Sequence, residues 1–306
     1  MAVAVPSITP EHARQFRAEG FFILERVVPP SDLEALRGEC QRFIDDRDRE
    51  MDRLGVDTLD LDHRGRRYFV HAYGKSPAVE RFLSSDLMVQ IAQAALGDTV
   101  YLFNEQYVVK AAERGMRFAW HQDSGFIGYP HRPYLTCWIA LDDVSEANGT
   151  VYLLPYARAG TRDVVEHVHD DEVEDERLAD AGDVAVAEDA EAADETNDMI
   201  GYFGDDPGDP VIVPAGSIAC FSSTLLHRSG PNTTDRMRRV YVAQYSAEPI
   251  LSEDRSGPRH LADPLLTHGM DAHAATCGVG TAGVSSGVRA ALKLFSERGL
   301  TATSVR

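Results

Sequence analysis

The sequence predicts a mainly β domain, a β-sandwich or jelly roll, with helices on its N-terminal side. Three helices are expected in about the first hundred residues. From residue 99 onward the apolar segments are short, rich in β-branched and aromatic residues, and separated by turn signals. Helices followed by many short antiparallel strands are typical of this fold class. The 306 residues are enough for one large domain with a packed core.

The N-terminal part predicts helices whose ends are marked by capping residues. In "ITPEHARQFRAEG" Thr9 is a candidate N-cap, Pro10 occupies the first helical position and Gly20 ends the helix. The segment 29–46 is expected to begin with a capping box of Ser31 and Glu34. Its apolar face consists of Leu33, Leu36, Cys40, Phe43 and Ile44. A further helix is expected over 84–98, closed by Gly97.

The strands are expected in five segments of the remaining chain. These are "TVYLFNEQYVVKAA" (99–112), "YLTCWIALDD" (134–143), "GTVYLLP" (149–155), "DPVIVPAGSIACF" (209–221) and "RRVYVAQYS" (238–246).

The formal net charge of -19 comes from one segment. Residues 163–209 contain 19 of the 49 acidic residues and one basic residue, Arg177, which leaves 30 acids and 29 bases elsewhere. This segment is therefore an acidic insert on a nearly neutral domain. A basic face is absent, which argues against nucleic-acid binding.

The chain is expected to form a single domain over 1–306 that carries the acidic insert and a Gly-rich C-terminal extension from about 255. The insert is either a solvated loop or a lid over a pocket, because long loops in compact domains are often functional. Within the extension, 277–287 is expected to be a flexible linker and 288–300 a short amphipathic helix.

The remaining bulk features favour a cytoplasmic protein. The N-terminus lacks the pattern of a signal peptide, and no apolar run reaches the roughly 18 residues of a membrane span. The cysteines Cys40, Cys137, Cys220 and Cys277 are far apart and are expected to be reduced thiols. Oligomeric state cannot be inferred from these features.

The stretch "FAWHQDSGF" (118–126) contains a candidate pair of metal ligands, His121 and Asp123. An H-x-D triplet alone is more often a surface turn. Here it lies at a strand end, where residues two apart point to the same side, and "TLLHRSGPN" supplies His227 after another strand. Two imidazoles and one carboxylate are the ligand set of non-haem Fe(II) oxygenases. His167 and His169 in "EHVHDD" imitate a metal pair, but their charged surroundings favour solvated side chains.

Arg238, eleven residues after His227, is a candidate anion anchor. A guanidinium can bind a carboxylate through a bidentate pair, and 2-oxoglutarate has one carboxylate beyond the two oxygens that would chelate iron. The alternative is an ordinary surface arginine beside Arg236 and Arg239.

The sequence resembles the phytanoyl-CoA dioxygenase-like family of Fe(II)- and 2-oxoglutarate-dependent oxygenases, which includes ectoine hydroxylase. The resemblance rests on "FRAEGFFILERVVPPSDLEALR", "EQYVVK", "WHQDSGF", "CWIALDDVSEANGTVYLLPYARAG", "VPAGSIACFSSTLLHRSGPN" and "RRVYVAQYS". It covers most of the chain except the acidic insert and the tail. It implies a double-stranded β-helix with N-terminal helices, and the use of Fe(II), 2-oxoglutarate and O2.

The resemblance also implies roles for individual residues. His121, Asp123 and His227 would bind iron, and Arg238 the distal carboxylate of 2-oxoglutarate, with Ser229 beside it. Lys110 and Trp138 match positions that line the cofactor pocket, although a salt bridge of Lys110 and core packing of Trp138 are equally open. Asp123 stands where halogenases of this fold have a small residue, so the resemblance implies oxygen chemistry.

The substrate is expected to be a small molecule whose C–H bond is oxidised. Phe126 and Tyr129, near the metal loop, are candidate substrate-binding residues, although core packing explains aromatic residues there equally well. If the acidic insert folds over the entrance, it would favour a cationic substrate. Two other classes remain open: a Zn or Mn cupin-type hydrolase or isomerase, and a non-catalytic jelly-roll binding protein.

Overall fold

The structure is a computed structural model that describes residues 8–112, 116–169, 199–267 and 270–271. Most of the acidic insert lies outside the described residues, as do the linker and the helix expected in the C-terminal extension. The division of the chain into one domain with an insert and an extension therefore stays a prediction.

The helices of the structure precede most of the strands, as the sequence predicts. They are α1 (Pro10–Glu19), α2 (Pro30–Leu54), α3 (Pro77–Leu83), α4 (Asp86–Leu96) and the single turn α5 (Tyr156–Ala159).

The caps confirm two of the expected helix boundaries and correct a third. Thr9 is the N-cap of α1, and Gly20 ends it in the left-handed conformation at φ 90°. Gly97 ends α4. The capping box expected at Ser31 is wrong, because the N-cap of α2 is Pro29, two residues earlier, and it makes no side-chain capping hydrogen bond. Pro30 occupies the first helical position, where its missing N–H removes no intrahelical hydrogen bond.

The strands form two larger antiparallel sheets and one hairpin-like pair. The large sheet contains β1 (Phe21–Leu24), β2 (Thr58–Leu59), β3 (Asp62–His63), β4 (Arg67–Val70), β5 (Val100–Lys110), β7 (Leu135–Ala140), β12 (Ile218–Ser222), β14 (Arg238–Ser246), β15 (Asp263–Thr267) and β16 (Met270–Asp271). The small sheet contains β6 (Phe118–His121), β8 (Val151–Leu153), β11 (Asp209–Pro210) and β13 (His227–Ser229). The pair consists of β9 (Val168–His169) and β10 (Met199–Ile200).

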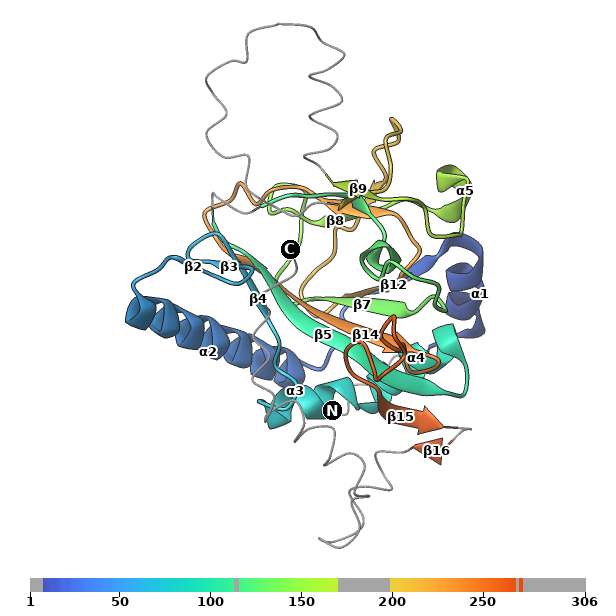
Figure 1. The fold of residues 1–306 in the computed structure, drawn as a ribbon, viewed down its shortest axis with the longest axis horizontal. Coiled ribbons are helices and arrows are strands. Elements are labelled where there is room, and N and C mark those ends of the chain that lie inside the picture. The colour runs from blue at the N-terminus through green and yellow to red at the C-terminus, as the bar shows by residue number, and fades with distance from the viewer. Residues whose placement is uncertain (1–7, 113–115, 170–198, 268–269, 272–306) are drawn as a thin grey trace, which may run out of the picture.

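The fold is the jelly roll, or double-stranded β-helix, that the sequence predicts. Figure 1 shows α2, α3 and α4 along one side of the large sheet and the small sheet on its other side. Successive residues of a strand in the large sheet therefore point to opposite faces and pack in two different hydrophobic cores. Tyr241 packs with the helices, whereas Val242 packs with Val151 and Leu153 of the small sheet.

One expected strand is divided in the structure. The segment 209–221 forms β11 in the small sheet and β12 in the large sheet, so a single strand there is wrong. The chain changes sheets through a turn in which Gly216 has φ 82° and donates to the carbonyl of Ala140 at 2.8 Å. Glycine accepts this conformation without a Cβ clash.

The described cysteines are free thiols, as the sequence predicts. Cys40, Cys137 and Cys220 are free and buried. Among the described residues no helix has the length and apolar character needed to cross a bilayer.

Candidate metal centre and cosubstrate pocket

The two candidate histidine ligands lie side by side on neighbouring strands of the small sheet. His121 ends β6 and His227 begins β13, and the two residues are directly paired in the antiparallel register. Their ring centroids are 4.2 Å apart. Pairing across the ladder places both side chains on the same face of the sheet, so residues 106 positions apart in sequence approach one point.

Backbone carbonyls fix the orientation of both imidazoles. His121 Nδ1 lies 2.7 Å from the carbonyl oxygen of Ala119, and His227 Nδ1 lies 2.9 Å from that of Leu225. A carbonyl only accepts, so each Nδ1 carries the proton and Nε2 is the nitrogen that would coordinate a metal.

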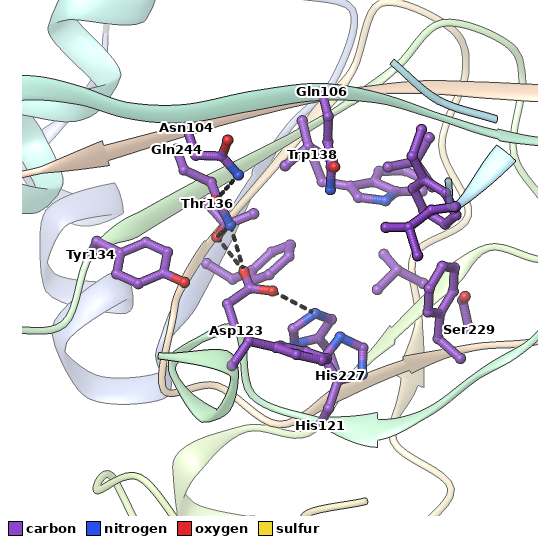
Figure 2. Close-up of a pocket in the computed structure, with 18 of the residues that line it drawn as sticks. Asn104, Gln106, His121, Asp123, Tyr134, Thr136, Trp138, His227, Ser229 and Gln244 are labelled. Carbon is purple, nitrogen blue, oxygen red and sulfur yellow. Dashed lines mark hydrogen bonds and ion pairs between the residues drawn. The ribbon is translucent and has the colours of Figure 1, made fainter. Parts of the chain in front are cut away.

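Asp123 reaches the histidines through a turn of 3₁₀-helix. The strand ends at His121, and the 3₁₀-helix Asp123–Phe126 begins at the aspartate. Thr136 donates to Oδ2 of Asp123 at 2.5 Å, and Gln244 donates to the same oxygen at 3.1 Å. Oδ1 faces His227 Nε2 at 3.5 Å, as Figure 2 shows. The carboxylate thus has one oxygen held by β7 and β14 and the other turned toward the imidazoles.

The structure therefore brings together the three residues that the sequence predicts as ligands. One ligand atom from each of His121, Asp123 and His227 lies within 4.8 Å of the other two. This set of two imidazoles and one carboxylate has the composition of the facial triad of non-haem Fe(II) enzymes, in which positions stay open for a cosubstrate and O2.

Arg238 is buried in the pocket beside this centre. Its side chain is 2% exposed, and Cζ lies 5.6 Å from the ring centroid of Trp138. Nη2 donates to the carbonyl of Gly149 at 2.9 Å, but Nε and Nη1 are buried without a hydrogen-bond partner among the described residues. Burial lowers the pKa of Arg238 to about 10, which still leaves it charged at neutral pH. A buried guanidinium with unused donors fits a carboxylate ligand.

Lys110 and Ser229 are bound to each other next to Arg238. The Nζ atom of Lys110 donates to Ser229 Oγ at 2.7 Å and to the carbonyl of Gly230 at 2.5 Å. Lys110 is fully buried and pairs with Arg238 across β5 and β14. Ser229 and Trp138 line the pocket. Lys110 is not among the lining residues, but it binds Ser229, which is.

The two candidate substrate residues have different positions. Phe126 is 43% exposed, lines the pocket, and its ring lies 5.5 Å from that of His121. Tyr129 is outside the described lining, and its hydroxyl donates to the carbonyl of Leu251 at 2.7 Å. It therefore anchors the segment that follows β14.

His167 has a structural contact that the sequence reading missed. The solvated position expected for it is wrong, because Nε2 accepts a hydrogen bond of 2.9 Å from the backbone N–H of Gln122, between His121 and Asp123. A Cβ at Gly125 would lie 2.5 Å from this ring. Burial lowers the pKa of His167, which suits the neutral acceptor. His169 is in β9 and does not join the triad.

One pocket of about 480 Å³ contains the triad, Arg238 and several residues that no sequence motif identified as functional. Thr136, Asn104 and Gln244 form a polar chain in which Asn104 donates to Gln244 at 3.1 Å. Arg259 and His260, from the segment before β15, also belong to the lining. A volume of this size suits a cosubstrate together with a small molecule.

Comparison with known proteins assigns the chain to a family. The family described as Phytanoyl-CoA dioxygenase (PhyH) matches residues 16–240. A probable alpha-ketoglutarate-dependent hypophosphite dioxygenase of Stutzerimonas stutzeri is 28% identical over 170 residues, 56% of this chain and 53% of that protein. An ectoine dioxygenase of Nocardia farcinica (strain IFM 10152) is 24% identical over 253 residues, 81% of each chain. The match thus spans about half the length of the first of these relatives.

Solved structures with a similar fold include a further ectoine-related enzyme. The structure of EctD from S. alaskensis with 2-oxoglutarate and 5-hydroxyectoine superposes with a TM-score of 0.57 at 22% identity, covering 88% of this chain and 89% of that chain. This likeness confirms the jelly roll. Since the family match extends over more than two thirds of the sequence and includes all three triad residues, the chain belongs to the phytanoyl-CoA dioxygenase family of Fe(II)/2-oxoglutarate oxygenases.

Proposed function

We propose that the protein is an Fe(II)- and 2-oxoglutarate-dependent dioxygenase that hydroxylates, or otherwise oxidises, a C–H bond of a small molecule. The observation that carries the proposal is the position of Arg238 in the same pocket as the triad. Two of its buried donor groups have no partner among the described residues, and an anion of the right length would satisfy them.

The rival classes explain this arginine less well. A zinc or manganese hydrolase could use the same three ligands, but it has no need of a buried guanidinium in the pocket. A binding protein without catalysis needs neither group. Leaving a charged, incompletely paired side chain in a core is costly, so its presence favours a ligand that completes it.

The residues present fit both groups. Nε2 of His121 and His227 and Oδ1 of Asp123 would hold Fe(II), and Arg238 would hold the distal carboxylate of 2-oxoglutarate. Ser229 and Trp138 line the same side of the pocket, and Lys110 holds the Ser229 hydroxyl in place. When bound, iron and 2-oxoglutarate supply the oxidising chemistry, which consumes O2 and yields succinate and CO2.

The chain's own contribution is positioning and exclusion of water. Thr136 and Gln244 hold one oxygen of Asp123, so the carboxylate keeps the other toward the metal. Phe221 and Val242 are buried in the wall between the sheets and keep that side of the centre apolar. Hydroxylation, desaturation and further oxidation are all outcomes that such a site supports, and cytoplasmic location stays a prediction.

The test is 2-oxoglutarate turnover. Protein supplied with Fe(II), 2-oxoglutarate and O2 should form succinate, slowly without substrate and faster with a matching metabolite. His227→Ala should abolish succinate formation, whereas Arg14→Ala, at an exposed position of α1, should keep it. Succinate formation that persists in His227→Ala would contradict the proposal.

A further inference from the structure

The lining of the pocket is strongly cationic. It contains Arg67, Arg228, Arg238 and Arg259, and the single carboxylate among the described lining residues is Asp123. Under the proposed function Asp123 would bind the metal and Arg238 would bind 2-oxoglutarate. The other described lining residues therefore include three arginines and no carboxylate, and Glu105, outside the lining, lies 3.7 Å from His71. Apart from Asp123, the described lining has no carboxylate that could bind the cationic substrate expected from the acidic insert.

Two of these arginines are accounted for by other contacts. Arg228 alternates with the inward-facing His227 and Ser229 on β13, and its guanidinium lies 3.9 Å from the ring centroid of Tyr152. Arg67 donates to the carbonyl of Leu61 at 2.9 Å and has further partners. Arg259 also has a carbonyl partner and an aromatic neighbour, but its Nε is buried and has no hydrogen-bond partner among the described residues.

Arg259 lies next to the metal loop. Nη2 donates to the carbonyl of Phe126 at 2.7 Å, and Cζ lies 5.6 Å from the ring centroid of Tyr129. Nε is buried without a hydrogen-bond partner, and no carboxylate forms an ion pair with this side chain within the part of the chain that the structure describes. The carbonyl fixes the guanidinium while leaving donors for a ligand.

Arg259 and Arg238 contact different parts of the pocket lining. Figure 2 shows Trp138 and Ser229 on one side of Asp123 and Tyr134 on the other. Arg238 lies over Trp138, whereas Arg259 donates to the carbonyl of Phe126, whose ring lies 5.5 Å from that of His121. The pocket thus has two cationic groups beside the triad, of which 2-oxoglutarate would use one.

Two histidines add further donor groups to the pocket lining. His71 and His260 line the pocket and are exposed, and the ring of His260 lies 5.2 Å from that of Phe103. Nδ1 of His71 is bound to the carbonyl of Glu105, which leaves Nε2 for a ligand, and His260 directly follows Arg259 in the chain. Guanidinium with imidazole is a donor set suited to an oxyanion.

We propose that the substrate carries a carboxylate or a phosphorus oxyanion, and that Arg259, with His71 and His260, binds it while Arg238 holds 2-oxoglutarate. This inference rests on the proposed function. The anion would direct the remainder of the substrate toward the metal, so Arg259 is a determinant of substrate class and orientation.

The experiment uses the full chain with Fe(II) and saturating 2-oxoglutarate under anaerobic conditions, so that the Arg238 subsite is filled. Acetate and inorganic phosphate are the probes, and calorimetry measures their binding. We expect saturable binding of at least one probe, weakened 10-fold or more by Arg259→Gln, partly restored in Arg259→Lys, and unchanged in Arg255→Gln, an exposed arginine of the same segment. Equal binding by wild type and Arg259→Gln, or no saturable binding, would overturn the inference.

The weak visible absorption of the Fe(II)–2-oxoglutarate complex, recorded in the same samples, separates the two proposals. If the absorption is present in every variant but Arg259→Gln binds the probes as tightly as wild type, the anion subsite is refuted and the proposed function is not. Absence of the absorption in wild type refutes the proposed function. In a metabolite screen, acids should stimulate succinate formation and their neutral amides should not; a best substrate without an anionic group would overturn the inference.

Discussion

Thr136 donates a hydrogen bond of 2.5 Å to Oδ2 of Asp123 and thereby decides which carboxylate oxygen faces His227. The threonine lies in the middle of β7, where it is 2% exposed and pairs with Gln244 on β14. The large sheet thus orients a ligand that belongs to a loop of the small sheet.

This contact predicts the effect of Thr136→Val, which keeps the shape of the side chain but removes the donor. We expect Fe(II) affinity to fall about 10-fold, because partners of a ligating carboxylate typically contribute 10- to 100-fold. Thr136→Ser should keep most of the affinity. Competition with a fluorescent chelator measures both values, and equal affinity in Val and Ser variants would show that the hydrogen bond is not what orients Asp123.

Arg238→Leu should weaken the binding of 2-oxoglutarate strongly while changing the stability of the ligand-free protein little. Affinity for 2-oxoglutarate should fall about 100-fold, since charge-assisted hydrogen bonds to the carboxylate are lost. The ligand-free fold should lose little stability, because the substitution also removes a buried charge with unused donors. Thermal unfolding with and without 2-oxoglutarate tests both parts, with the exposed Arg236→Gln as control. Full stabilisation of Arg238→Leu by 2-oxoglutarate would refute the assignment.

Gly125→Ala should disturb the metal loop through His167. The added Cβ would meet the imidazole at 2.5 Å, and that ring is held by the N–H of Gln122 at 2.9 Å. We expect weaker metal binding and a lower unfolding temperature. The double variant Gly125→Ala/His167→Ala should recover part of both, because the small side chain removes the clash. Failure of the second substitution to restore anything would mean that the damage at 125 is unrelated to His167.

His71 predicts a pH-dependent contribution to stability. The neighbouring Glu105 raises the pKa of His71, and the two side chains lie 3.7 Å apart. A raised pKa in the folded state stabilises the protein fully below the unfolded pKa of about 6.5, and the contribution disappears as pH rises through the folded pKa. Because His71 is exposed, the effect should stay below about 1 kcal/mol.

The unfolding free energy of wild type minus that of His71→Gln, measured between pH 5 and 9, tests this sign. The difference should be largest at the acidic end. An advantage of wild type that grows toward alkaline pH would contradict it.

The sequence predicted the fold and the triad because both depend on local patterns. The 3.6-residue periodicity of Leu36, Cys40 and Phe43 is a property of one helix, and the alternation in "RRVYVAQYS" is a property of one strand. His121, Asp123 and His227 follow strands whose ends a jelly roll brings together. In the structure, the antiparallel pairing of His121 with His227 brings these two side chains together.

Features that depend on contacts between distant segments could not be predicted. Thr136 reads as one more β-branched strand residue, and only the fold shows that it meets Asp123. Arg259 lies in a stretch with no motif, and only the fold shows that it contacts Phe126 and lines the pocket. The division of 209–221 between two sheets was missed because apolar residues continue across the turn at Gly216.

The most direct test of the central claim is an anaerobic titration of the protein with Fe(II) and 2-oxoglutarate, followed by visible absorption. Wild type should develop the weak charge-transfer absorption at one iron per chain, and His121→Ala, Asp123→Ala and His227→Ala should each abolish it. Arg238→Gln should develop it only at much higher 2-oxoglutarate concentration. A wild-type protein that binds iron without this absorption, or absorption that survives loss of a triad residue, would contradict the account.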